Sequence, residues 1–279
     1  MPEERTAWTA HLSTGLSVPV VSQGEPRGIP LVLLHAWGES SSVFDRLLNR
    51  LPSDQWAVSF DQRGHGSADR PESGYTLRHF AADVVAFLDE LAVPSAVLLG
   101  SSSGGYVAQQ VAAERPDRVA GLVLVGAPRT LQAEPSFAAE VGQLTDPVAP
   151  EWVRSSIAWF PMFSRVPEWF IEDRISDGVA VPARVWRETL RGLVEAVPPT
   201  QGGRVVAPTL VLYGGRDDAV RLEEEEALTA SIPGARLVVY EDTGHLVLWE
   251  HPKRVARDTV GFLEGADLRV ATASARGRS

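Results

Sequence analysis

Residues 96–106 read Ala-Val-Leu-Leu-Gly-Ser-Ser-Ser-Gly-Gly-Tyr, a short apolar run that passes through small residues into a helical pattern. An apolar run of this length is typical of a buried strand, and the apolar spacing after Tyr106 is typical of a helix. A sharp turn between a strand and a helix needs small residues, and Gly100 and Gly104 stand two residues to either side of Ser102. Such a turn lifts the central hydroxyl clear of the sheet, at the positive end of the following helix. We therefore interpret Ser102 as a nucleophile, with a flexible Gly/Ser loop as the alternative.

Strand-like runs recur along the chain, with helical patterns between them. The apolar runs typical of buried strands are 31–34, 56–60, 96–99, 122–125, 209–213 and 236–240, and an opening hairpin is expected from 8–13 and 16–22 around Thr14-Gly15. The helical patterns are 43–51, 77–91, 106–113, 222–232 and 252–263. Strands that alternate with helices predict an α/β fold, with a mostly parallel eight-stranded sheet flanked by helices.

The alternation stops in the middle of the chain. This stretch contains several prolines, helix-like pieces and half of the eight tryptophans. We expect residues 131–204 to form a helical insertion, and residues 1–130 together with 205–265 to form one core domain. Residues 266–279 have little apolar content and are expected to be a mobile C-terminal tail.

Composition excludes several classes of function. The formal net charge of −10 offers no basic face for nucleic-acid phosphates and no polybasic membrane anchor. The chain has no cysteine, which excludes disulfides, thiolate catalysis and cysteine-ligated metals. Residues 1–6 lack the apolar run of a signal peptide, and no apolar stretch approaches the roughly 18 residues that cross a bilayer. We expect a soluble cytoplasmic protein that binds neither nucleic acid nor membrane; a monomer and a homodimer are both compatible with the sequence.

A serine hydroxyl needs a nearby base to act as a nucleophile at neutral pH, and histidine is the usual one. His245 follows the last predicted strand, on a loop at the same edge of the sheet as Ser102. Loops at this edge can bring distant residues together, so His245 is the candidate base. His251 precedes a proline and a helix start and is the alternative. His11 and His79 are expected to be structural or exposed to solvent.

The imidazole in turn needs a carboxylate that orients it and stabilises its charged form. The strand at 209–213 is followed by Gly-Gly-Arg-Asp-Asp, which offers two carboxylates at the required edge. We take Asp217 as the acid and Asp218 as the alternative. The strand at 122–125, the other place where such folds carry the acid, ends in Gly-Ala-Pro and offers none.

Acyl transfer also needs backbone N–H groups aimed at the oxygen on which negative charge develops. The residue after the nucleophile, Ser103, is expected to supply one of them. The loop after the strand at 31–34 reads His-Ala-Trp-Gly-Glu-Ser, and the Trp37 N–H is the expected second donor. The Trp37 indole would then wall the pocket, with simple core packing as the alternative for that side chain.

Together these motifs resemble the α/β-hydrolase superfamily. The matching segments are Leu-Leu-His-Ala-Trp-Gly-Glu-Ser (33–40), Asp-Gln-Arg-Gly-His-Gly-Ser (61–67), Gly-Ser-Ser-Ser-Gly-Gly (100–105), Gly-Gly-Arg-Asp (214–217), Gly-His (244–245) and Glu-His-Pro (250–252). The resemblance implies an α/β-hydrolase fold whose triad is Ser102, Asp217 and His245, in the chain order usual for the family. It also implies an oxyanion hole formed by Trp37 and Ser103, and a cap formed by the insertion.

The sequence departs from the family pattern at two places. Ala36 replaces a usual glycine in the oxyanion loop, and Ser101 stands where histidine or asparagine is common. Relatives such as haloalkane dehalogenases and epoxide hydrolases use an aspartate nucleophile, whereas a serine gives an acyl-enzyme. The resemblance therefore favours acyl chemistry.

The insertion is rich in aromatic residues, and ligand pockets are lined mostly by apolar and aromatic groups. We expect an apolar or aromatic substrate group in a pocket of Trp37, Trp159, Phe160, Phe163, Trp186 and Leu246, with packing of the insertion as the alternative for these side chains. The arginines at 154, 165, 174 and 184 are expected to be solvated, with binding of a substrate carboxylate as the alternative. The glutamates at 223–226 are expected to form a solvated helix start, with an acidic functional site as the alternative.

The leading interpretation is a hydrolase of a small-molecule carboxylic ester or lactone that uses no cofactor and no metal ion. Two alternatives stay within the same triad, namely carbon–carbon bond hydrolysis and perhydrolysis of the haloperoxidase kind. A ligand receptor or signalling protein on the same fold is the alternative from another class.

Overall fold

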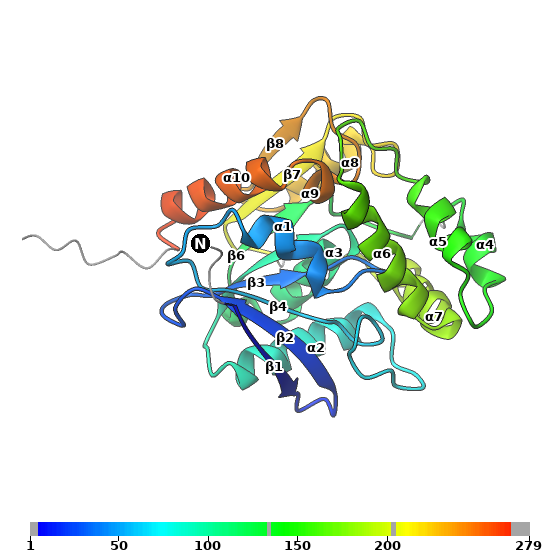
Figure 1. The fold of residues 1–279 in the computed structure, drawn as a ribbon. Coiled ribbons are helices and arrows are strands. Elements are labelled where there is room, and N and C mark those ends of the chain that lie inside the picture. Colours follow the sequence, from blue (N-terminus) through cyan, green and yellow to red (C-terminus); the bar gives the residue numbers. More distant parts are fainter. Residues whose placement is uncertain (1–4, 133–134, 202–204, 269–279) are drawn as a thin grey trace, which may run out of the picture.

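The computed structural model describes residues 5–132, 135–201 and 205–268, and these residues contain one eight-stranded sheet (Figure 1). The strands are β1 (Thr6–His11), β2 (Ser17–Gln23), β3 (Leu31–Leu34), β4 (Ala57–Phe60), β5 (Ala96–Ser101), β6 (Val119–Val125), β7 (Thr209–Gly214) and β8 (Arg236–Tyr240). Their order across the sheet is β1-β2-β4-β3-β5-β6-β7-β8. The pairs β1–β2 and β2–β4 are antiparallel and all others are parallel. The predicted α/β fold with a mostly parallel sheet is confirmed.

Helices cover both faces of the sheet, and the two-residue period of the strands separates the two cores. Leu31 and Leu33 belong to one hydrophobic core, while Val32 and Leu34 belong to the other, because successive strand residues point to opposite faces. The helices of the first core are α1 (Asp45–Leu48), α9 (Val247–Glu250) and α10 (Pro252–Gly265). Those of the second core include α2 (Leu77–Glu90), α3 (Ser103–Glu114) and α8 (Leu222–Ser231).

Four further helices lie between β6 and β7 in the chain and stand together at the right of Figure 1. They are α4 (Ala138–Gly142), α5 (Pro150–Ile157), α6 (Glu168–Ala180) and α7 (Ala183–Val194). Residues of α5 and α7 line a cavity together with the residues that follow β5, so these helices lie over the carboxyl ends of the central strands.

One helix differs from its prediction, and a second short helix was not predicted. The helix predicted at 43–51 is a 3₁₀ turn, Ser41–Phe44, followed by a single turn of α-helix that ends at Leu48. Pro52 disfavours helical geometry in the residue before it, so the chain leaves the helix early to enter β4. The short helix α9, immediately after His245, has no periodic pattern long enough to be recognised in the sequence.

The glutamate run at 223–226 was expected to be solvated, but Glu225 is fully buried and neither of its carboxylate oxygens has a hydrogen-bond partner among the described residues. Four consecutive helical residues cover the whole circumference of a turn, so one of them must face the core. Burial, together with the nearby charge of Asp217, raises the pKa of Glu225 well above its ordinary value.

The predicted C-terminal tail lies outside the described residues from position 269 onward. Of the residues before that point, Leu268 is buried and its N–H donates to the carbonyl of Leu263 at 2.8 Å.

His65, in the turn after β4, provides a test of the fold by its titration. The side chain is 1% exposed, its Nδ1 lies 2.9 Å from the Arg63 carbonyl oxygen, and burial lowers its pKa from 6.5 to about 3. The unfolded chain binds a proton at His65 more readily than the folded protein does. The protein therefore loses stability as the pH falls from 6.5 towards about 3. We compare the fall in the free energy of unfolding between pH 6.5 and pH 4.5 in the two proteins. This fall should be about 2–3 kcal/mol smaller in His65→Gln than in the unchanged protein.

Urea unfolding at the two pH values measures this difference. His79→Gln, on the exposed surface of α2, is the matched control for the exchange of a histidine for a glutamine. An equal loss of stability in the unchanged protein and in His65→Gln would contradict a neutral buried His65.

Candidate active site

Ser102 occupies the sharp turn between β5 and α3, with a φ of 47° and a ψ of −119°. A positive φ is unusual for a residue that has a Cβ, and the surrounding structure must hold it there. The Ser102 N–H donates to the Val125 carbonyl at 2.8 Å. A Cβ on Gly104 would lie 2.2 Å from the carbonyl oxygen of Leu34, so only glycine lets α3 begin this close to β3. The turn predicted around Ser102 is therefore present and is held by backbone contacts.

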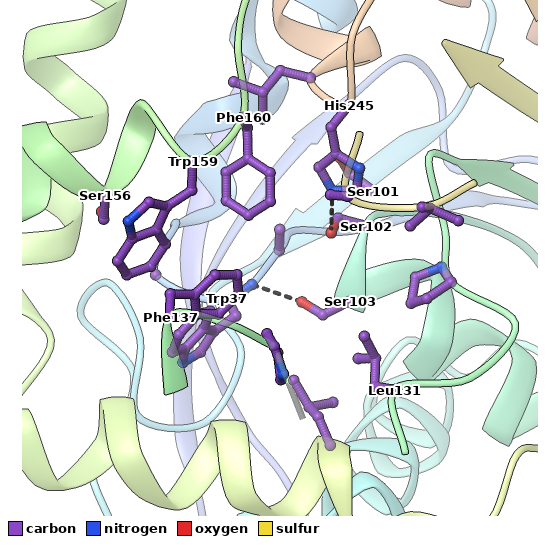
Figure 2. A pocket seen from close by; sticks show the side chains of 18 of the residues that line it. Trp37, Ser101, Ser102, Ser103, Leu131, Phe137, Ser156, Trp159, Phe160 and His245 are labelled. Carbon is purple, nitrogen blue, oxygen red and sulfur yellow. Dashed lines mark hydrogen bonds between the residues drawn. The ribbon is translucent and has the colours of Figure 1, made fainter. Parts of the chain in front are cut away.

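His245 and Asp217 meet at this turn from two different loops. The Ser102 Oγ lies 2.9 Å from His245 Nε2, and the bond is drawn in Figure 2. On the other side of the imidazole, Nδ1 lies 2.7 Å from Asp217 Oδ2. His245 follows β8 and Asp217 follows β7, so the parallel strands deliver both side chains to one edge of the sheet. The structure thus brings together the three residues that the sequence analysis selected.

The surroundings of Asp217 determine how the imidazole is oriented. The Asp217 side chain is fully buried, and its Oδ1 accepts hydrogen bonds from the N–H groups of Ala219 at 2.8 Å and Val220 at 3.0 Å. Because a carboxylate only accepts hydrogen bonds, Nδ1 of His245 carries the proton and the lone pair of Nε2 faces the Ser102 hydroxyl. This arrangement can remove the hydroxyl proton.

The alternatives for the base and the acid lie elsewhere. The Asp218 side chain is exposed and makes no hydrogen bond to His245 among the described residues. His251 contacts the hydroxyl of Ser164, with 3.1 Å between His251 Nε2 and the serine oxygen.

Two further residues hold His245, and the sequence analysis did not assign them this role. The buried carboxylate of Glu250 accepts a hydrogen bond from the Gly244 N–H at 3.0 Å and another from the Phe163 N–H at 2.7 Å. It therefore joins the His245 loop to the loop between α5 and α6. The Phe160 ring stacks on the imidazole, with 4.9 Å between the ring centroids. The Glu-His-Pro motif included Glu250, but no local signal showed what it contacts.

The two expected oxyanion donors lie beside Ser102. Ser103 is the first residue of α3, where backbone N–H groups have no carbonyl one turn earlier in the helix. The Trp37 N–H donates to the Ser103 hydroxyl oxygen at 2.8 Å, as Figure 2 shows. The Trp37 indole N–H donates to the Trp186 carbonyl at 3.2 Å, so the loop that carries Trp37 is also tied to α7.

A cavity of about 490 Å³ opens next to Ser102. Five of the six predicted pocket residues line it: Trp37, Trp159, Phe160, Trp186 and Leu246. The prediction for Phe163 is wrong. Its side chain is 39% exposed and packs against the Arg216 guanidinium, 4.0 Å from the ring centroid, and it is not among the residues that line the cavity.

Other lining residues were not singled out in the sequence. Phe137, in the loop before α4, stacks on Trp159 with a centroid distance of 4.3 Å and an interplanar angle of 3° (Figure 2). The remaining apolar lining includes Leu131, Ile157, Leu190, Leu193 and Trp249. Leu190 and Leu193 share α7 with Trp186 at helical spacing, but the other lining residues come from separate loops and helices that no sequence spacing groups.

Arg174 was expected to be solvated, but it is 4% exposed and lines the inner end of the cavity. Its guanidinium forms an ion pair with Asp177 at 3.0 Å and lies 4.9 Å from the centroid of the Phe170 ring. Burial raises the pKa of Asp177 from 3.8 to about 6. The ion pair lies within α6, and Asp177 connects this helix to the loop that carries Trp37 by accepting a hydrogen bond from Ser40.

Within residues 5–132, 135–201 and 205–268, no cluster of three or more histidine or carboxylate side chains is arranged to hold a metal ion. Of the helices in this part of the chain, none combines the length and the apolar character needed to cross a membrane.

Comparison with known proteins identifies the family. The model of the alpha/beta hydrolase family matches residues 31–258. A non-heme chloroperoxidase of Streptomyces lividans is 28% identical over 92% of this chain and 99% of its own length, and 3-oxoadipate enol-lactonase 2 of Acinetobacter baylyi is 26% identical over 80% and 84%. The structure of an esterase from Exiguobacterium antarcticum, 22% identical, shares the fold with a TM-score of 0.82 over 93% of this chain and 100% of that one. The family match covers most of the chain and includes the segments that carry Ser102, Asp217 and His245; this protein therefore belongs to the alpha/beta hydrolase family of enzymes.

Proposed function

We propose that this enzyme is a serine hydrolase that cleaves a small-molecule carboxylic ester or lactone through an acyl-enzyme intermediate. The observation that carries the proposal is the continuous hydrogen-bond chain from the Ser102 Oγ through His245 to Asp217, with distances of 2.9 and 2.7 Å. A buried carboxylate, an oriented imidazole and a half-buried hydroxyl that lines the cavity are the parts that activate a serine for attack on a carbonyl.

The reaction uses these groups in two halves. As the Ser102 Oγ attacks the carbonyl carbon, His245 Nε2 takes the hydroxyl proton and the carbonyl electron pair moves onto its oxygen. When the tetrahedral intermediate collapses, the alcohol leaves with the proton from His245 and the acyl group stays on Ser102. Water then attacks the acyl group, His245 again acts as the base, and the free acid leaves. The scheme requires no cofactor and no metal ion.

The cavity supports a substrate with an apolar or aromatic group. Its volume, about 490 Å³, lies in the range of small-molecule sites, and its lining is dominated by aromatic and aliphatic side chains. In this proposal residues 131–204 act as a cap over a core of residues 1–130 and 205–265, since Phe137, Trp159 and Trp186 line the cavity from above Ser102. The similarity to an enol-lactonase and to esterases supports the same class of substrate.

A second candidate is perhydrolysis, which the similarity to a non-heme chloroperoxidase favours. In that reaction hydrogen peroxide takes the place of water and converts the acyl-enzyme into a peracid and free enzyme. The triad and the acyl-enzyme are the same, so the two reactions differ only in the second nucleophile.

A fluorophosphonate probe and a panel of substrates test the proposal. We expect mass spectrometry to locate one adduct, on Ser102, and we expect aryl esters and lactones to be hydrolysed. The panel also contains acetate plus hydrogen peroxide, to detect peracid formation, and a β-diketone, to detect carbon–carbon cleavage. A ligand receptor would give no adduct at Ser102 and no turnover of any substrate. That combined result would overturn the proposal.

A further inference from the structure

The Trp37 N–H, one of the two expected oxyanion donors, already has an acceptor in the protein. That acceptor is the Ser103 hydroxyl oxygen, 2.8 Å from the Trp37 nitrogen. This is the distance at which an oxyanion bound by the same N–H would lie. Two oxygens cannot occupy one place, so the substrate oxygen reaches the Trp37 N–H only if the Ser103 side chain rotates away.

The Ser103 hydroxyl has a proton left to donate. A serine hydroxyl can accept hydrogen bonds through its lone pairs and donates one through its proton. Here it accepts from Trp37, and no protein group in the described part of the chain accepts its proton. Ser103 is half-buried and lines the cavity beside Ser102, where the substrate carbonyl must lie (Figure 2).

The position of Ser103 in α3 places a second donor of the same residue nearby. Its backbone N–H belongs to the first turn of the helix, where N–H groups lack intrahelical partners and the helix end favours negative charge. The backbone N–H and the hydroxyl of one serine can therefore hold a single oxygen together. Hydrogen bonds in series polarise one another, so a hydroxyl that accepts from an amide N–H is a stronger donor.

We propose that the Ser103 hydroxyl is a catalytic donor of the oxyanion hole, with the Trp37 N–H acting through it and not directly on the substrate. As the bond from Ser102 Oγ to the carbonyl carbon forms, the carbonyl electron pair moves onto oxygen and the Ser102 proton moves to His245. The Ser103 O–H donates a hydrogen bond to the charged oxygen and keeps its proton throughout. The inference rests on the proposed serine-hydrolase function and changes one of its two oxyanion donors.

Three variants test this role. Ser103→Ala keeps the backbone N–H and removes the hydroxyl, Ser103→Thr keeps both, and Ser176→Ala removes an exposed hydroxyl of α6 away from the cavity. We expect Ser103→Ala to lower kcat for an aryl ester about 100-fold with KM changed less than about threefold, since the lost bond is made mainly in the transition state. Ser103→Thr is expected to recover most of the loss, and Ser176→Ala to match the unchanged enzyme.

The fluorophosphonate reaction gives a readout that a merely structural role would not produce. In its pentacoordinate transition state the phosphoryl oxygen carries negative charge in the place of the carbonyl oxygen, so the rate constant should fall in Ser103→Ala by a factor similar to that for kcat/KM. A kcat in Ser103→Ala equal to or above that of the unchanged enzyme would overturn the inference, because the freed Trp37 N–H would then be the working donor. A parallel loss of Tm without recovery in Ser103→Thr would overturn it as well.

Failure of the inference is distinguishable from failure of the proposed function. If the unchanged enzyme neither turns over esters nor reacts with the probe at Ser102, the proposed function fails before any Ser103 variant is compared. If the unchanged enzyme does both and Ser103→Ala equals it, only the inference on Ser103 fails.

Discussion

Replacing Ser102 with alanine is expected to abolish ester hydrolysis, with kcat lower by roughly a millionfold. The Ser102 hydroxyl is the only group in the proposed scheme that forms a bond to the acyl carbon. Without it, His245 and the oxyanion donors can at most assist a water molecule in the cavity. Steady-state hydrolysis of an aryl ester measures the loss, and the fluorophosphonate adduct should disappear from the intact mass spectrum.

The three consecutive serines provide the control for this variant. Ser103→Ala should retain the adduct and a measurable kcat, so the two substitutions separate the nucleophile from a neighbouring hydroxyl. Thermal unfolding should show that Ser102→Ala folds, because among the described residues the Ser102 side chain has one hydrogen bond to lose, the one to His245. A variant that keeps more than about 1% of the native kcat would mean that another group is the nucleophile.

The second large effect is expected at Asp217. Asp217→Asn should lower kcat about ten-thousandfold, because an amide can donate to Nδ1 of His245 and so favour the tautomer whose proton lies on Nε2. An imidazole in that form cannot accept the Ser102 proton. The same steady-state assay, repeated across a range of pH, measures the loss of kcat in Asp217→Asn. It also shows whether that loss persists at high pH.

Asp218→Asn is the matched control, since it makes the same change of atoms one residue further along. Asp218 lines the cavity, but its side chain is exposed and makes no hydrogen bond to His245 among the described residues, so kcat should fall far less than in Asp217→Asn. If Asp218→Asn lost turnover and Asp217→Asn did not, the acid would be the other carboxylate.

Much of the fold could be predicted from local patterns. The strand–turn–helix around Ser102 was recognisable because an apolar run, small residues and a helical spacing follow one another without interruption. The eight strands were recognisable for the same reason, with ends displaced by at most three residues. The helix at 43–51 was predicted too long, since its apolar spacing extends past the place where Pro52 and the entry into β4 end it.

Side-chain environments were predicted less well. Arg174 and Glu225 were assigned to solvent on residue type, yet both are buried, because burial depends on which side of a helix faces a neighbour. Phe163 was assigned to the pocket on composition, yet its ring packs against Arg216 and is partly exposed. In each case the packing of the tertiary structure, and not the residue type, decides the environment of the side chain.

The sequence alone determined the class of fold and the loops on which the candidate site residues stand, since strand and helix patterns are local and parallel strands end at a common edge. Only the tertiary structure decided which atoms meet there. It distinguished Asp217 from Asp218, because adjacent residues of one loop point in different directions and only one carboxylate lies 2.7 Å from the imidazole. It also placed the Trp37 N–H on the Ser103 hydroxyl, a contact across 66 residues that depends on how closely β3 and α3 approach at Gly104.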